Sequence, residues 1–289
     1  MKPGALSAGR PSDGAGGGAV QRERCLLPLH DTQGRAVRID VVIDQPAATG
    51  RPHPALVLLP SSLRDSLDCD VFAAALAGLG WRVLRPQPRG MGCSTGPMDG
   101  LDLHVLAHDV VQVVDALGGG RAVLAGHAFG HFVARVAAMD HPRQVRGVAL
   151  LGAAARTFPP GLTGALDVAA DPAQAEPDRL QALRRAFFAA ASDPSEWLQG
   201  WYPQWRAAYR AAGSSPPKAA WWPASTVPLL DLQASEDPWR PADSRNELRD
   251  ALGPLVTVEV IEGASHALLP EQPQAVAAAV DRWARTLPP

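Results

Sequence analysis

A five-residue frame with a glycine at each end is the stretch of this chain best suited to chemistry. The frame Gly126-His127-Ala128-Phe129-Gly130 follows the apolar run 122–125 and precedes a helical pattern that reaches Met139. In a Gly-x-Ser-x-Gly nucleophile elbow, small flanking residues let a backbone of positive φ pass close to its neighbours and raise the central side chain above a sheet. The centre here is Ala128, so the frame predicts an elbow without a hydroxyl group.

Histidines on both sides of the frame, and two more ahead of it, could contribute to a site. His127 and His131 flank Ala128, and either could contact a substrate or steady the turn. His104 and His108 form a His-x-x-x-His pair, a spacing that can hold a metal ion. Because this pair shares the polar face of the expected helix, opposite its leucine and valine stripe, we predict a solvated helix face and no metal site.

Strands and helices alternate ahead of the frame. Segments 24–29 and 36–43 flank the turn sequence Asp31-Thr32-Gln33-Gly34, which predicts an opening β-hairpin. In chain order, the patterns then predict a strand buried on both faces at 55–59, a helix at 70–78, a strand at 81–84 and a helix at 103–117.

The alternation breaks after a further buried strand predicted at 145–151. Helical patterns cover 177–190 and 194–212, and an aromatic stripe recurs every fourth residue at Trp197, Trp201, Trp205 and Tyr209. Pro203 interrupts this stripe, so we expect a kink or two short helices there. Strands are predicted again at 227–234 and 255–261, followed by a last helix that turns Val276, Val280 and Trp283 inward.

Composition limits the class of protein. The 289 residues are 46% hydrophobic with a net charge of -2, which favours one large α/β domain and gives no electrostatic field for nucleic acid or an anionic membrane. No apolar run approaches the roughly 20 residues that span a bilayer, and the Gly, Ala, Ser and Pro content of 1–21 predicts a flexible tail. The cysteines are few, lack metal-ligand spacing and indicate reduced thiols in a cytoplasmic protein: Cys25, Cys69 and Cys93.

This order of landmarks resembles the α/β-hydrolase superfamily, from about Arg24 to Trp283. The resemblance implies an α/β fold with a mostly parallel sheet of about eight strands and helices on both faces. It divides the chain into a core at 22–155 and 227–289 and a helical cap at 156–226, inserted before the last two strands.

The resemblance also assigns roles, because the family's nucleophile, acid and base follow one another in that order. Ala128 takes the nucleophile position, Asp237 the acid and His266 the base. The backbone amides of Ser62 and Phe129 take the places of the oxyanion hole. Backbone donors need no particular side chain, so the hole can survive sequence change.

Other positions depart from the family pattern. Pro60-Ser61-Ser62 stands where His-Gly is usual, and Gln87 replaces the aspartate of an Asp-x-Arg-Gly loop. Cys93 and Ser94 lie in that loop near the pocket, but neither has a general base beside it in sequence, so we do not expect a substitute nucleophile.

Binding residues are expected above the elbow. The resemblance implies a structural role for His127, while His131 lies near the pocket floor as a candidate substrate contact. The cap position of the tryptophan stripe predicts that Trp197, Trp201 and Trp205 form the wall of an apolar binding site.

Three functions follow from these residues. The first is an enzyme that uses His266 and Asp237 as an acid-base dyad without serine, either activating water for hydrolysis or removing a substrate proton for lyase or C–C cleavage chemistry. The second is a serine esterase in which alanine has replaced the nucleophile, and the third is a non-catalytic receptor for a small ligand. The expected partner is a small hydrophobic molecule, no motif implies a cofactor, and a homodimer is left open.

Overall fold

The computed structural model describes residues 19–47 and 53–288. Residues 1–18 of the predicted tail lie outside the described residues, and residues 20 and 21 already belong to the first strand. No helix in the described ranges is long and apolar enough to cross a membrane.

One eight-stranded sheet organises the fold, in the order β1-β2-β4-β3-β5-β6-β7-β8. The hairpin strands β1 and β2 pair antiparallel, β2 joins β4 antiparallel, and all later pairings are parallel. This confirms the predicted fold class. The strands are β1 (Val20–His30), β2 (Ala36–Pro46), β3 (Ala55–Leu59), β4 (Arg82–Pro86), β5 (Ala122–His127), β6 (Val145–Leu151), β7 (Leu229–Ala234) and β8 (Val256–Ile261).

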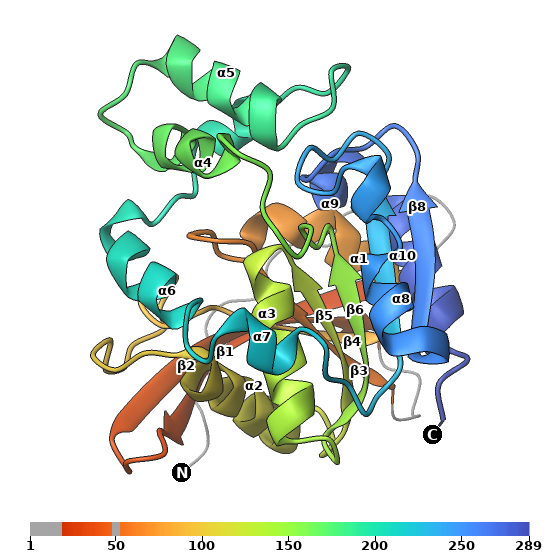
Figure 1. The fold of residues 1–289 in the computed structure, drawn as a ribbon. Helices are drawn as coiled ribbons and strands as arrows, with labels where there is room; N and C mark the ends of the chain where they lie inside the picture. The colour runs from red at the N-terminus through yellow and green to blue at the C-terminus, as the bar shows by residue number, and fades with distance from the viewer. Residues whose placement is uncertain (1–18, 48–52, 289) are drawn as a thin grey trace.

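Helices cover both faces of this sheet (Figure 1). The alternation of side chains along β3 shows why: Val57 and Leu59 join the core under α2 and α3, whereas Leu56 and Leu58 join the core under α1 and α10. A strand buried on both faces needs this continuous apolar sequence. The covering helices are α1 (Asp70–Gly78), α2 (Leu103–Leu117), α3 (Phe129–Asp140), α8 (Glu247–Leu252), α9 (Leu268–Glu271) and α10 (Pro273–Ala284).

The segment between β6 and β7 forms a group of short helices, with α4 and α5 beyond the ends of the strands in Figure 1. It contains α4 (Leu162–Ala170), α5 (Glu176–Ala186), two 3₁₀ turns at Ser195–Leu198 and Pro203–Trp205, α6 (Arg206–Ala212) and α7 (Lys218–Trp221).

Two helix predictions in this segment are wrong in detail. The helix expected at 177–190 ends at Ala186, and the pattern at 194–212 becomes two 3₁₀ turns followed by the short α6. Gly200 has φ +80° and Pro203 lacks a backbone N–H, so the chain cannot run through as one helix. The expected break at Pro203 is present, and α4 was not predicted.

Candidate functional site

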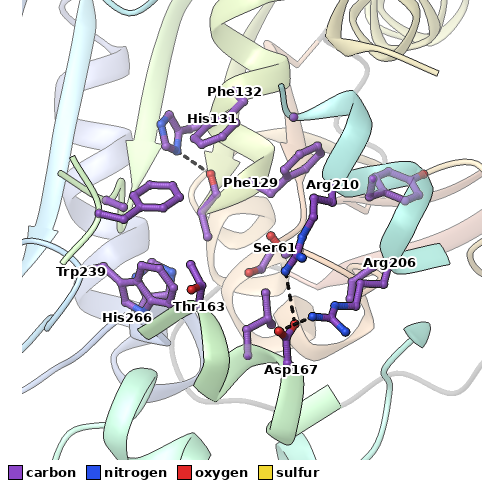
Figure 2. A pocket seen from close by; sticks show the side chains of 18 of the residues that line it. Ser61, Phe129, His131, Phe132, Thr163, Asp167, Arg206, Arg210, Trp239 and His266 are labelled. Carbon is purple, nitrogen blue, oxygen red and sulfur yellow. Dashed lines mark hydrogen bonds and ion pairs between the residues drawn. The ribbon is translucent and has the colours of Figure 1, made fainter. Parts of the chain in front are cut away.

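A cavity of about 260 Å³ lies where the inserted helices meet the carboxyl ends of the strands. Its lining includes five of the residues expected at a site: Ser62, Ala128, Phe129, His131 and His266. They come from the β3–α1 loop, the β5–α3 corner, α3 and the segment after β8. Figure 2 shows His131 and His266 in this pocket together with its aromatic and charged residues.

The β5–α3 corner has the geometry that the glycine frame predicts. Ala128 joins strand to helix with φ 45° and ψ -113°, a left-handed conformation that is uncommon for a residue with a Cβ. A Cβ added to Gly126 would lie 2.4 Å from the carbonyl carbon of Gly130, and one added to Gly130 would lie 2.4 Å from the oxygen of Leu59. Both glycines are therefore required by close backbone approach.

His266 and Asp237 form a buried hydrogen-bonded pair. The Nδ1 of His266 lies 3.0 Å from Asp237 Oδ2, and the backbone N–H of Trp239 donates to Asp237 Oδ1 at 2.8 Å. Asp237 follows β7 and His266 follows β8, and because these strands are parallel neighbours their carboxyl ends meet. Since a carboxylate only accepts hydrogen bonds, Nδ1 carries a proton, and in the neutral form of the ring Nε2 then has the lone pair.

The amides of Ser62 and Phe129 are free to act as donors. Both residues line the cavity, and neither amide donates a hydrogen bond within the described part of the chain. Phe129 is the first residue of α3, so its N–H has no partner one turn earlier in the helix. The two amides thus have the availability that an oxyanion site requires.

His127 and His131 are both buried but differ in their surroundings. His127 donates from Nε2 to the backbone oxygen of His266 at 2.7 Å and so holds the segment that carries that residue. His131 donates from Nδ1 to the carbonyl oxygen of Ala128 and lines the cavity. Burial lowers the pKa of His131 well below its usual value, so its ring is neutral and its Nε2 can accept a hydrogen bond.

The prediction that tryptophans form the wall of the cavity is wrong. Trp197, Trp201 and Trp205 are not among the residues that line the cavity. Trp197 is 1% exposed, and the guanidinium of Arg64 lies 4.4 Å from the centre of its ring and 4.6 Å from that of Trp201. Since 194–212 is not one helix, a four-residue spacing does not place these side chains on a common face.

Other aromatic residues form the wall that the tryptophans do not. Phe187 and Trp239 pack against the His266 ring, with centroids 5.7 Å and 5.3 Å from it, and Trp239 donates from its indole to the oxygen of Ala186. Phe187 lies just past the end of α5, and Trp239 lies two residues after Asp237, a proximity that could have indicated its role. The remaining aromatic lining residues are Phe129, Phe132, Phe158 and Tyr209.

His104 on α2 and Ser94 in the Cys93 loop each make a side-chain hydrogen bond, and neither residue lines the cavity. The ring of His104 pairs with Asp140 at 2.6 Å, and the described residues contain no cluster of His, Cys, Asp and Glu suited to a metal ion. Ser94 is buried, and its hydroxyl donates to the oxygen of Gln87 at 2.8 Å. Gln87 accepts a hydrogen bond from the backbone N–H of Ser66 and donates one to its hydroxyl, so it organises the structure of the loop.

The burial of His127 gives a testable dependence of stability on pH. Burial, followed by the nearby His266, lowers the pKa of His127 from 6.5 to about 4. The unfolded chain therefore takes up this proton first, and stability that is complete above pH 6.5 is lost as the pH falls toward 4. Between pH 7 and pH 5 we expect His127 to account for a loss of about 2 kcal/mol in the free energy of unfolding.

Urea unfolding of the wild type and of His127→Gln at both pH values measures this loss. The glutamine amide can donate to the oxygen of His266 but does not titrate, so the variant should lose less stability on acidification. His131, whose pKa is also lowered, still contributes to the acid loss in both proteins. An equal loss in wild type and variant would contradict the expected titration of His127.

The sheet, the sharp β5–α3 corner and the Asp-His pair at the carboxyl edge together define a protein of the α/β-hydrolase fold. Residues 54–188 match the family model for the alpha/beta hydrolase fold.

Known proteins similar to this chain include several enzymes. Epoxide hydrolase A of Mycobacterium tuberculosis is 40% identical over 126 residues, which are 43% of this chain and 37% of that protein. The 2-hydroxymuconate semialdehyde hydrolase of Pseudomonas sp. strain CF600 is 38% identical over 87 residues, 30% of each chain. The chain thus matches only 30% to 37% of these relatives' lengths.

A solved structure extends the likeness to most of the fold. A thermophilic esterase from Thermogutta terrifontis superposes with a TM-score of 0.71 at 21% identity, covering 90% of this chain and 98% of that one. Likeness at this level of identity shows the shared fold.

Proposed function

We propose that this protein is an enzyme that acts on a small hydrophobic organic molecule with His266 and Asp237 as an acid-base dyad and no serine nucleophile. The observation that carries the proposal is the buried 3.0 Å hydrogen bond from His266 to Asp237 beside a cavity that Ala128 also lines. Burying a carboxylate and an imidazole costs free energy. A pair that is kept buried and hydrogen-bonded therefore favours a function in which the pair takes part.

Proton transfer in the proposed reaction begins at the Nε2 of His266. This nitrogen removes a proton either from a water molecule, which then attacks the substrate, or from the substrate itself, which leads to elimination or C–C cleavage. The Asp237 carboxylate stabilises the imidazolium that forms, and the amides of Ser62 and Phe129 stabilise the developing oxyanion. The imidazolium then returns its proton to the leaving atom. No acyl-enzyme is formed in this reaction, because Ala128 has no hydroxyl group.

The alanine at 128 disfavours ordinary ester hydrolysis. Removing the nucleophile of a serine hydrolase lowers turnover by about a millionfold, while the oxyanion hole and binding retain about a thousandfold over water. A serine-less esterase would be poor, so chemistry that needs only a base is favoured. The similarity to an epoxide hydrolase and to a 2-hydroxymuconate semialdehyde hydrolase supports hydrolytic or C–C bond cleavage reactions.

A second candidate is a serine esterase whose nucleophile is replaced by alanine. The two free amides and the oriented His266 favour it, because only a hydroxyl group is absent from the complete set. The two candidates predict different results when that hydroxyl group is supplied.

Ala128→Ser is the experiment that tests the proposal. With an activity that needs no nucleophile, we expect no increase in turnover of the best substrate from a panel of aryl esters, epoxides and 1,3-diketones. Hydrolysis of 4-nitrophenyl acetate should appear only weakly, because the pocket is not adapted to that reaction. Initial rates for wild type and variant across the panel measure both.

Ala154→Ser is the matched control, because Ala154 also lines the cavity but follows β6 and is not part of the β5–α3 corner. A gain in ester hydrolysis of about a thousandfold or more from Ala128→Ser alone would overturn the proposal and establish the disabled esterase. Absence of turnover by the wild type on every substrate, with ligand binding retained, would overturn it in favour of a receptor.

A further inference from the structure

Three charged side chains lie together in the cavity lining, and the proposed chemistry does not use them. They are Asp167 on α4 and Arg206 and Arg210 on α6, shown as a group in Figure 2. Arg206 forms an ion pair with Asp167. Arg210 forms a longer ion pair with the other carboxylate oxygen of Asp167, at 3.6 Å and without a hydrogen bond.

The charges of this group do not balance. Two guanidinium groups face one carboxylate, which leaves one positive charge in excess. The two histidines of the lining cannot neutralise it, because a histidine side chain is never negatively charged under these conditions. The guanidinium of Arg210 donates no hydrogen bond within the described part of the chain, and its side chain is 63% exposed. One cationic fork is therefore available at the cavity without a carboxylate of its own.

Most of the rest of the cavity is apolar. Phe129, Phe132, Phe158 and Phe187 contribute rings, and Leu63 and Leu166 contribute aliphatic side chains. In Figure 2, His266 and Trp239 lie on one side of the pocket and the arginines on the other. A ligand that spans it meets a base at one end, hydrocarbon along its length and a cation at the other end.

We propose that Arg210, assisted by Arg206, binds the carboxylate of an aromatic or aliphatic carboxylic acid whose reacting carbon lies at His266. A guanidinium fork matches a carboxylate in shape and forms charge-assisted hydrogen bonds with it. The ligand carboxylate accepts the hydrogen bonds that Arg210 does not make to Asp167, with which it forms only a long ion pair at 3.6 Å. This inference rests on the proposed function for the position of the reacting carbon, but the recognition of the anion is independent of turnover.

Isothermal titration calorimetry with phenylacetate and phenylacetamide tests the inference. The two molecules have the same size and a planar polar end, and they differ in charge. We expect phenylacetate to bind the wild type at least about tenfold more tightly, with the difference shrinking as salt is raised. Arg210→Gln should abolish the preference and leave the affinity for phenylacetamide unchanged.

Arg184→Gln is the control. Arg184 is an exposed arginine on α5 outside the cavity lining, and its substitution removes the same charge from the chain. Equal affinities for the two ligands in the wild type, no binding of either, or equal effects of Arg210→Gln and Arg184→Gln would each overturn the inference. If Arg210→Gln lowers the melting temperature and weakens both ligands alike, the arginine only ties α4 to α6. A carboxylate preference in a protein without turnover would sustain this inference while the proposed function fails.

Discussion

Replacing His266 with alanine is expected to lower kcat by about ten-thousandfold on the substrate that the wild type turns over best. The His266 ring lines the cavity and is hydrogen-bonded through Nδ1 to the buried carboxylate of Asp237. This bond leaves Nε2 of the neutral ring as the nitrogen that can accept a proton. Without it, nothing removes the proton on which the proposed reaction depends. Steady-state rates for wild type and variant at saturating substrate measure the loss.

Two further measurements separate lost chemistry from lost structure. The affinity for phenylacetamide should change little, since the alanine enlarges one side of the cavity and leaves the phenylalanine lining in place. Added imidazole should restore part of the rate by occupying the space that the side chain vacates. His104→Ala on the outer surface of α2 is the control, and a loss of less than tenfold for His266→Ala would contradict a catalytic base at this position.

The sequence predicted the core of this fold closely because local pattern and tertiary burial agree there. The strand at 55–59 and the helices at 70–78 and 103–117 have the bounds that their apolar patterns gave. A strand buried on both faces has a continuous apolar sequence, and a helix between two such strands has a one-sided stripe with a stop residue. The glycine frame also predicted the β5–α3 corner, because close backbone approach excludes any Cβ at Gly126 and Gly130.

The segment over the cavity was predicted less well, because its residues are buried by contacts with residues that are distant in sequence. Trp197 packs against Phe187 and Phe188 and under Arg64 from the β3–α1 loop, which no periodicity within 194–212 encodes. Periodicity indicates a shared face only if one helix carries all the residues. Here a glycine of positive φ and a proline divide the stripe.

The candidate site was predicted where motifs define it and missed where packing defines it. Asp237 and His266 follow adjacent strands, so their pairing follows from strand order. Trp239 and Phe187 contact His266 from two separate segments, and Arg206 and Arg210 face Asp167 across two short helices. Apart from the closeness of Trp239 to Asp237 in sequence, nothing in the surrounding sequence marks these residues, because they meet only in the folded chain.

The second large effect is expected from Asp237→Asn, which changes one atom of the side chain and should lower kcat by about ten-thousandfold. Asp237 Oδ1 accepts the backbone N–H of Trp239, and the asparagine oxygen can keep that bond. The asparagine amide then faces His266 Nδ1 as a donor and requires a lone pair on that nitrogen. The proton moves to Nε2, which can no longer act as a base.

Asp243→Asn is the matched control, since Asp243 is an exposed aspartate in the turn Ala242–Ser244. Folding and phenylacetamide affinity should be unchanged in both variants, and only Asp237→Asn should lose turnover. The double variant Asp237→Asn with His266→Ala gives the sharpest test, because groups that act as one unit have strongly non-additive effects. If the pair is a dyad, the double variant should be no slower than His266→Ala alone. Losses that simply multiply would mean that Asp237 supports the fold or the substrate independently of His266, and the dyad would be abandoned.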